Sequence, residues 1–386
     1  MFWTALVGLL MHTQAFDVTT LESAIRQDPK AAATMIRQRI KEDELNQGAS
    51  PIDSGLKVLF AIQVAGEHNV RVLSDGKLLT ALTNLGDGLY ASVANLKDGD
   101  GFFASYQVDD AIKRDRLPVE VYTPNPAVQS PPGGRKGELR AMGEFKSTVY
   151  PGTTRQWYIY LPPNLEPTQP YPVLIAQDAQ WDREWIANGL ENCARTGRIP
   201  ATVGVFIEPG QSEPGKYTNR SAEYDPLSPT YTKMLLDEIL PQVEKLVPLS
   251  KDPAQRAITG MSSGGICSFN ACWERPDQFG VAISFIGSFA NIASGPTKRE
   301  GGHNFPFLVR KTDKKPIRVF LQDGSNDLDN DHGNWWICNQ QMAAALKYKG
   351  YDVVWVPGKG FHSTKHARRI FDQALVWWMG KPDRVE

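Results

Sequence analysis

The sequence predicts an α/β protein with a doubly wound, mostly parallel sheet, preceded by a small β-sandwich. After residue 138, short apolar runs alternate with segments of helical length. Strands that are apolar on both faces are typical of a parallel sheet covered by helices on both sides. Between residues 51 and 123, short apolar runs are separated by turn residues, as in a sandwich. A Pro- and Gly-rich stretch, residues 124–138, predicts a linker between the two regions.

Composition narrows the class of protein. The chain has 386 residues, of which 41% are hydrophobic and 22% charged, so it can form a substantial core. Its formal net charge of -1 argues against a nucleic-acid partner. No run after the N-terminus is long and apolar enough to span a bilayer. The four cysteines show neither C-x-x-C nor metal-ligand spacing, which predicts no metal site and leaves one disulfide open against free buried thiols.

The first residues predict an exported protein. The segment from Phe2 to Met11 is apolar, the first charge is Asp17, and Ala15 is a small residue suited to a cleavage site. This pattern fits a secretory signal peptide over residues 1–15, although no Lys or Arg precedes the apolar run. We therefore expect export to the periplasm or the medium, with a cytoplasmic location as the alternative.

The next two segments differ in periodicity. Residues 16–50 carry apolar residues at helical spacing and predict a helical pair broken near Pro29. Residues 51–123 predict the sandwich, with an Asp75-Gly76 turn signal. Its strands are expected near residues 58–62, 70–73, 88–93 and 101–106.

Residues 139–386 predict the catalytic α/β domain. The apolar runs that predict strands are residues 157–161, 172–176, 202–207, 257–259, 281–286, 317–321 and 352–356. Helices are expected at residues 231–247, from the serine-rich turn to 274, at 338–349 and at 365–379. In such a sheet a ligand binds beyond the carboxyl ends of the strands. Chemistry should therefore come from the loops at that edge.

One of these loops carries a nucleophile motif. Gly260-Met261-Ser262-Ser263-Gly264 matches G-x-S-x-G and follows the strand at 257–259. In α/β-hydrolases this motif places a serine on a strained strand-to-helix turn, where glycines leave room for the backbone. The backbone N–H of Ser263, at the start of the helix, would then face an oxyanion. The alternative interpretation is a small-residue turn at a helix start.

A serine nucleophile needs a base and an acid that orients the base. In α/β-hydrolases these follow in the order Ser, Asp, His. Asp327, beyond the strand at 317–321, is the predicted acid, with Asp329 as second choice. His362 follows a glycine-rich turn after the last strand and is the predicted base. His366 is expected on the final helix as a surface or capping residue.

The loop after the strand at 172–176 should supply a second oxyanion donor. The expected donor is the backbone N–H of Ala179 or Gln180. Trp181 and Trp335 lie in candidate rim loops, where an aromatic face could stack on a sugar or phenolic ring. The alternative is that these tryptophans belong to the core.

Together these motifs resemble the putative esterase family, which includes enterochelin esterases and feruloyl and acetylxylan esterases. The resemblance covers roughly residues 143–380, and the motifs stand in the family's order. They are Gln177–Trp181, Asn219–Tyr224, Gly260–Gly265, Trp273–Phe279, Gly324–Asp327 and Gly360–His362. The resemblance implies an α/β-hydrolase fold and a serine esterase acting through Ser262, Asp327 and His362. Phe361 departs from the pattern, because glycine commonly precedes this histidine.

The resemblance extends to two further features. The sandwich is similar to the early-set immunoglobulin-like modules that precede some esterases. Arg220 and Glu223 match an Arg-x-x-Glu segment of the family. We expect these two side chains to form an internal ion pair that braces the active-site loops, with a substrate contact as the alternative.

The predicted function is therefore a serine-type carboxylic ester hydrolase that works through an acyl-enzyme without a metal or organic cofactor. The expected substrate is a small molecule or glycan that carries a carbohydrate-linked or phenolic ester. Three alternatives stay open: a siderophore esterase, an acyltransferase with the same three residues, and a non-catalytic glycan-binding protein. The sequence leaves the acyl group and the oligomeric state undetermined.

Overall fold

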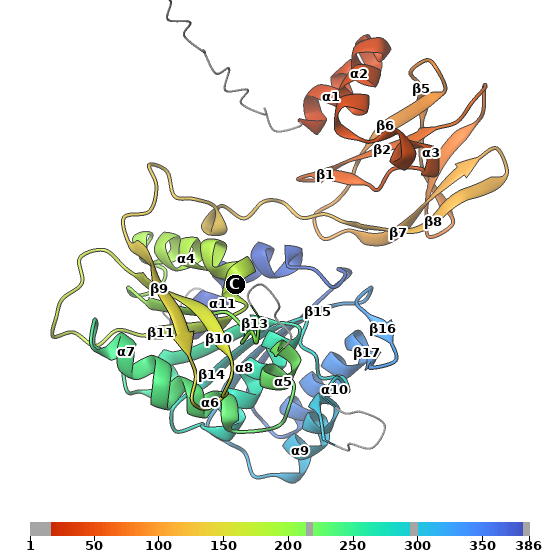
Figure 1. The fold of residues 1–386 in the computed structure, drawn as a ribbon. Helices are drawn as coiled ribbons and strands as arrows, with labels where there is room; N and C mark the ends of the chain where they lie inside the picture. Colours follow the sequence, from red (N-terminus) through yellow and green to blue (C-terminus); the bar gives the residue numbers. More distant parts are fainter. Residues whose placement is uncertain (1–16, 214–218, 294–299, 381–386) are drawn as a thin grey trace, which may run out of the picture. The chain divides into compact units, whose positions relative to one another are not determined.

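The computed structural model describes residues 17–213, 219–293 and 300–380 (Figure 1). The chain divides after Thr123 into two compact units. The signal peptide expected over residues 1–15 lies outside the described residues. No helix in the described part of the chain is long and apolar enough to cross a membrane.

The first unit contains the predicted β-sandwich, built from two four-stranded antiparallel sheets. One sheet has the order β1 (Ile52–Ser54), β2 (Lys57–Gln63), β6 (Leu89–Asn95), β5 (Thr83–Asn84). The other has the order β4 (Lys77–Ala81), β3 (Val70–Ser74), β7 (Gly101–Val108), β8 (Ala111–Glu120). The core between them includes Phe60, Val72 and Tyr106. β8 was not expected, because its charged residues and Pro118 conceal the strand pattern.

The N-terminal helices belong to the same unit. They are α1 (Val18–Gln27), α2 (Pro29–Arg39) and α3 (Glu42–Gln47). The Asp28 side chain caps α2, and Pro29 takes its first position, where a missing N–H has no cost. Val18 and Leu21 join one buried cluster with Leu59 and Leu89 of the sandwich. The helices therefore cover the outer face of the β1-β2-β6-β5 sheet.

The Pro- and Gly-rich segment after Thr123 is tied to the second unit by side-chain hydrogen bonds. The Asn125 side chain donates to the carbonyl oxygens of Arg368 and Arg369. Glu191 accepts the backbone N–H groups of Lys136 and Gly137. The short helix η1 (Pro126–Val128) also lies in this segment. The segment predicted as a linker is therefore held against the second unit.

The second unit is built on an eight-stranded sheet (Figure 1). Its order is β18 (Asp352–Gly358), β15 (Arg318–Gly324), β14 (Val281–Phe285), β13 (Arg256–Met261), β11 (Val173–Gln177), β12 (Val203–Ile207), β10 (Thr154–Leu161), β9 (Glu138–Lys146). The strands from β18 to β12 pair in parallel, and β10 is antiparallel to both of its neighbours. The predicted doubly wound, mostly parallel sheet is confirmed. β9 was not expected, because it is a largely polar edge strand.

Helices cover both faces of this sheet (Figure 1). One face packs against α4 (Ala179–Arg195) and α11 (Lys365–Met379). The other packs against α6 (Thr230–Met234), η2 (Leu235–Ile239), α7 (Leu240–Glu244), α8 (Ser263–Glu274), α9 (Phe305–Lys311) and α10 (Trp335–Tyr348). The remaining short elements are α5 (Arg220–Tyr224), η3 (Pro253–Gln255), η4 (Gly302–Asn304), β16 (Asp329–Asn330) and β17 (Gly333–Asn334).

Two helices differ from the sequence prediction. The helix expected over residues 231–247 is divided by η2, a one-turn π-helix that ends just before Pro241. Proline lacks an N–H and collides with the carbonyl one turn earlier, which accounts for the break in the regular pattern. α4 begins at Ala179, where a loop was expected. The first turn of α4 therefore lies at the carboxyl edge of the sheet.

Candidate active site

Ser262 stands on a sharp corner between β13 and α8. Its backbone angles, φ 58° and ψ -120°, are unfavourable for a residue with a side chain. A Cβ at Gly260 would lie 2.6 Å from the Gly264 carbonyl carbon, and one at Gly265 would lie 2.9 Å from the Gly287 Cα. Glycine is therefore required on both sides of the corner.

Ser262, Asp327 and His362, which lie far apart in the sequence, meet at this corner. His362 Nε2 lies 2.9 Å from Ser262 Oγ. His362 Nδ1 lies 2.6 Å from Asp327 Oδ1. The Asp327 side chain is fully buried, whereas 24% of the His362 side chain is exposed. The histidine can therefore reach solvent and substrate while its carboxylate partner stays dry.

Two loops hold this arrangement in place. The loop after β15 carries Asp327, and the loop after β18 carries His362. The backbone N–H groups of Ser325 and Asn326 donate to the carbonyl oxygens of Gly358 and Gly360, at 2.9 and 3.1 Å. A Cβ at Gly324 would lie 2.6 Å from the Gly360 carbonyl carbon. The close approach of the loops, which only glycine permits, brings the acid next to the histidine.

A second carboxyl group lies beneath Asp327. Asp323 is completely buried and accepts hydrogen bonds from Gly324 N and Asn339 Nδ2. Burial, together with the nearby Asp327, raises the pKa of Asp323 far above its ordinary range. Among the described residues no N–H group donates to Asp327 Oδ2, and the Asp323 carboxyl lies within hydrogen-bond reach of Asp327. A protonated Asp323 can donate a hydrogen bond to Asp327 Oδ2.

The expected oxyanion donors lie at the starts of two neighbouring helices. Ser263 is the first residue of α8, and Ala179 and Gln180 are the first two of α4. Backbone N–H groups in a first helical turn have no intrahelical acceptor. A Cβ at Gly264 would lie 3.1 Å from Asp178 Oδ2, so the two helix starts are close together. This geometry suits a pair of donors facing one oxyanion, a role that stays a prediction.

The expected ion pair between Arg220 and Glu223 is wrong, because each side chain has another partner. Arg220 forms two hydrogen bonds to Asp178, at 2.7 and 2.8 Å. Glu223 forms two to Arg155, at 2.6 and 2.9 Å, and both of these side chains are fully buried. Asp178 sits in the left-handed conformation just before α4, at φ 57°. The two pairs thus brace the loops separately, and Glu223 is inaccessible to a substrate.

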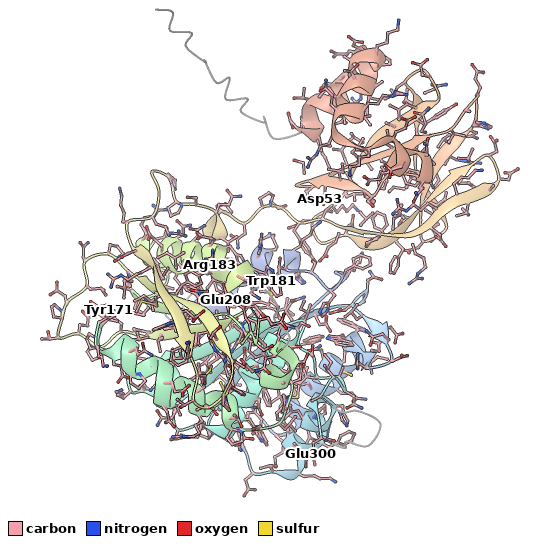
Figure 2. All side chains as sticks on the ribbon, viewed as in Figure 1. Asp53, Tyr171, Trp181, Arg183, Glu208 and Glu300 are labelled. Carbon is pink, nitrogen blue, oxygen red and sulfur yellow. The ribbon has the colours of Figure 1, made fainter. Side chains whose placement is uncertain are left out.

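The two tryptophans expected at the rim differ in exposure. Trp181, labelled in Figure 2, lies on the first turn of α4, and 59% of its surface is exposed. Trp335 is 2% exposed, and its ring meets the His362 ring edge-to-face at a centroid distance of 5.8 Å. The expectation that Trp335 offers a face to the substrate is therefore wrong. A buried indole against the histidine instead limits the positions that the imidazole can take.

The competing candidates lie elsewhere. Asp329 is exposed on β16. His366 lies in the first turn of α11, but it is buried, with Nδ1 3.1 Å from Gln322 Nε2, so the expected surface or capping role is wrong. The four cysteines are free. Within the described ranges no three potential metal-ligating side chains cluster.

Sequence reasoning missed several residues that contact the site. Ser288 Oγ lies 3.1 Å from Ser262 Oγ, and Trp335 Nε1 lies 3.2 Å from Ser288 Oγ. Asn339 holds Asp323 and also donates to the Gly287 carbonyl oxygen. A small residue in the loop after a strand was the one available signal for Ser288. For Asn339, in the middle of α10, the sequence offers no signal.

Comparison with known proteins identifies the family. A family model described as putative esterase matches residues 148–376. The chain belongs to the putative esterase family. Membership of this family supports the predicted enzyme class, an ester hydrolase.

Two curated relatives each align with more than half of the chain. Over 231 residues the chain is 30% identical to the iron(III) enterobactin esterase of Dickeya dadantii, covering 57% of this chain and 50% of that protein. Over 245 residues it is 23% identical to the uncharacterized protein YbbA of Bacillus subtilis, covering 59% of this chain and 93% of that protein. The chain therefore spans about half the length of the enterobactin esterase that it matches.

Solved structures support the α/β-hydrolase fold. The enterobactin esterase of Shigella flexneri superposes with a TM-score of 0.60 at 16% identity, covering 85% of this chain and 96% of that one. A ferulic acid esterase of the fungus Anaeromyces mucronatus superposes with a TM-score of 0.51 at 17% identity, covering 66% of this chain and 94% of that one. At these identities the likeness concerns the fold alone.

Proposed function

We propose that the protein is a serine carboxylesterase in which Ser262, His362 and Asp327 act together. The observation that carries this proposal is the continuous contact from Asp327 Oδ1 to His362 Nδ1, at 2.6 Å, and from His362 Nε2 to Ser262 Oγ, at 2.9 Å. Both distances are those of hydrogen bonds. A carboxylate on one nitrogen leaves the other free to accept the serine proton.

The reaction would proceed in two stages. His362 accepts the proton of Ser262 as Oγ attacks the ester carbonyl carbon, and the backbone N–H of Ser263 and of Ala179 or Gln180 stabilises the oxyanion. Protonated His362 then returns the proton to the leaving alcohol, which leaves an acyl-enzyme. Water, activated by the same histidine, releases the acid. Asp327 keeps the imidazole oriented and stabilises its positive charge.

The entrance of the site favours an ester with an aromatic or sugar ring. Trp181 exposes its indole beside the start of α4, and Arg220 lies 5.9 Å from that ring. An exposed aromatic face suits stacking against a sugar or phenolic ring. We therefore place phenolic or carbohydrate-linked esters first.

A siderophore ester is the second candidate, and the enterobactin esterase of Dickeya dadantii is the relative that favours it. Both candidates carry a hydroxylated ring. The preference can be measured as kcat/KM for enterobactin and for methyl ferulate. We expect methyl ferulate to be hydrolysed at least tenfold more efficiently, whereas a preference of that size for enterobactin would reverse the order of the candidates.

The role of Trp181 can be tested on whichever ester is preferred. Trp181→Ala removes the ring, and we expect kcat/KM for the ring-bearing ester to fall by about tenfold, since ring stacking contributes roughly 0.5–1.5 kcal/mol beyond buried area. Trp181→Phe is the matched control and should retain most of the activity. Ethyl acetate, which has no ring, should be hydrolysed equally by all three proteins. Equal losses on both esters in Trp181→Ala would contradict a role in ring recognition.

A further inference from the structure

Ser288 contacts the proposed nucleophile at two points. It lies in the loop that follows β14, and it is 1% exposed. Its Oγ lies 3.1 Å from Ser262 Oγ, and its backbone N–H donates to the Ser262 carbonyl oxygen at 3.0 Å. On its other side, Ser288 Oγ lies 3.2 Å from Trp335 Nε1. Ser288 therefore connects a buried indole to the hydroxyl group that would attack the ester.

The donor in each of these contacts follows from the chemistry of the groups. An indole N–H can only donate, so Trp335 donates to Ser288 Oγ. At the other end, the Asp327 carboxylate accepts from His362 Nδ1, so Nε2 of the neutral ring accepts from Ser262. Ser262 thus directs its single proton to His362. In the contact between the two serines, Ser288 must therefore be the donor.

We infer that Ser288 is a positioning residue for the reaction, whose hydroxyl group donates to Ser262 Oγ and keeps the Ser262 proton directed at His362. Trp335 would fix the direction of that hydrogen bond by occupying the acceptor side of Ser288. The inference rests on the proposed function, because it assigns Ser288 to the same nucleophile. It adds a donor that lies outside the three residues of the proposed mechanism.

The chemistry of both stages gives this donor a role. During attack, a bond forms between Ser262 Oγ and the carbonyl carbon, the carbonyl π electrons move to the oxygen, and the serine proton passes to His362. In the second stage the bond to Ser262 Oγ breaks, and the oxygen leaves with the electron pair and recovers a proton from His362. Partial negative charge develops on Oγ in both stages. A donor at 3.1 Å stabilises that charge and is already oriented before the reaction.

One helix reaches both ends of the arrangement. Trp335 and Asn339 are four residues apart on α10, so they lie on the same face. Trp335 contacts Ser288, next to the nucleophile, and Asn339 contacts Asp323, next to the acid. Asn339 also donates to the carbonyl oxygen of Gly287, the residue before Ser288. α10 thus holds Ser288 by its side chain and by its backbone.

The test measures the rate at which a fluorophosphonate labels Ser262, together with kcat/KM for p-nitrophenyl acetate. We expect Ser288→Ala to lower both rates by about ten- to a hundredfold, since a hydrogen bond to a developing charge contributes roughly 1.5–3 kcal/mol. Ser284→Ala is the matched control. Ser284 is a fully buried serine in the same strand and loop region, and its hydroxyl has no hydrogen-bond partner among the described residues. It should label at the wild-type rate.

A double-mutant cycle tests whether Trp335 acts through Ser288. Trp335→Phe keeps an aromatic ring against His362 but removes the N–H, and we expect it to slow labelling by about two- to tenfold. In the double variant with Ser288→Ala, the second substitution should add no further loss. A full additional loss would overturn the assigned direction of the hydrogen bond. Unfolding temperatures of all variants show whether each protein is folded.

The split between kcat and KM provides a readout that a purely structural role would not move. Without Ser288 the Ser262 hydroxyl can rotate away from His362 Nε2, so kcat should fall while KM stays close to its wild-type value. A change in KM alone, together with wild-type labelling, would overturn the inference. If Ser288→Ala does not fold, Ser288→Cys, a weaker donor of similar size, should still label more slowly than wild type, and an equal rate would overturn it.

Failure of the inference and failure of the proposed function give different results. If the probe does not label Ser262 in the wild-type protein, the proposed nucleophile is wrong. If Ser262 is labelled in the wild type and equally fast in Ser288→Ala, the nucleophile stands and the role of Ser288 is wrong.

Discussion

Asp323 and Asp327 are two carboxyl groups four residues apart with different environments. Asp327 accepts hydrogen bonds from His362 Nδ1 and Leu328 N. Asp323 is completely buried, and its pKa is raised by burial and by Asp327. The environment of Asp323 therefore favours its protonated form, which can donate a hydrogen bond to Asp327.

This assignment predicts opposite outcomes for one substitution at two positions. Asp323→Asn replaces a neutral donor by another, so hydrolysis of p-nitrophenyl acetate should stay within a few-fold of wild type. Asp327→Asn removes the carboxylate that orients the imidazole, and kcat should fall by about a thousandfold or more. Steady-state kinetics of the two variants checks both expectations. A loss in Asp323→Asn as large as that in Asp327→Asn would show that Asp323 is charged in the native protein.

Asp182 is a second buried carboxyl group, and its titration should make the stability of the protein depend on pH. Burial raises the pKa of Asp182 to about 6, and the Trp185 indole N–H that it accepts opposes part of this shift. The folded pKa is higher than that of the unfolded chain, so the stability that protonated Asp182 contributes is complete below about pH 4 and is lost by about pH 6. Asp182→Asn should abolish this loss.

Compared with wild type, Asp182→Asn should be more stable at pH 7 than at pH 4 by at most roughly 3 kcal/mol in the free energy of unfolding. Urea unfolding of wild type and variant at both pH values measures it. A difference between the two proteins that does not change with pH would contradict the raised pKa.

At the scale of elements, the contact between the loops after β15 and β18 brings Asp327 and His362, the proposed acid and base, together. A Cβ at Gly324 would lie 2.6 Å from the Gly360 carbonyl carbon, so Gly324→Ala must separate the loops. We expect kcat/KM to fall by about a hundredfold or more, because small displacements of catalytic groups are costly.

Gly197→Ala is the control: its φ is +71°, but a Cβ there meets no atom within 4 Å. It should cost about 1–2 kcal/mol of stability and no activity. Equal activity in both variants would contradict the role of the loop contact.

The elements also show what the sequence can predict. Buried parallel strands such as β11 and β12 are continuous apolar runs, and the sequence located both. The edge strands β8 and β9 were missed, because one side of an edge strand faces solvent and its residues carry no strand pattern. The start of α4 was missed because Asp178 takes a left-handed conformation that cannot be predicted from the sequence.

Prediction of the site shows a similar division. The proximity of Ser262, Asp327 and His362 was predictable, because a motif and the order of strand ends fix their place. The partners of Arg220 and Glu223 and the burial of Trp335 were not, because they depend on which loops pack together. Arg220 pairs with Asp178 and Glu223 pairs with Arg155, so the expected local pair between Arg220 and Glu223 does not form. Long-range pairing of charges therefore needed the structure.

At the scale of the whole molecule, the proposed chemistry lies in one unit. Ser262, Asp327, His362 and the expected oxyanion donors all belong to the second unit, residues 124–386. The first unit has its own core between two sheets and under three helices. The match of the family model, residues 148–376, also falls within the second unit. The proposed chemical step therefore takes place in the second unit, and none of the proposed catalytic residues belongs to the first.

The measurement that tests the central claim most directly is hydrolysis of p-nitrophenyl acetate by wild type and Ser262→Ala, with fluorophosphonate labelling mapped by mass spectrometry. We predict that the wild type is labelled at Ser262, that labelling is lost in the variant, and that hydrolysis falls by several orders of magnitude. Ser284→Ala, which removes a buried hydroxyl that has no hydrogen-bond partner among the described residues, should behave as wild type. Equal hydrolysis by wild type and Ser262→Ala would contradict the account, because Ser262 would then be a structural turn residue and the esterase nucleophile would lie elsewhere.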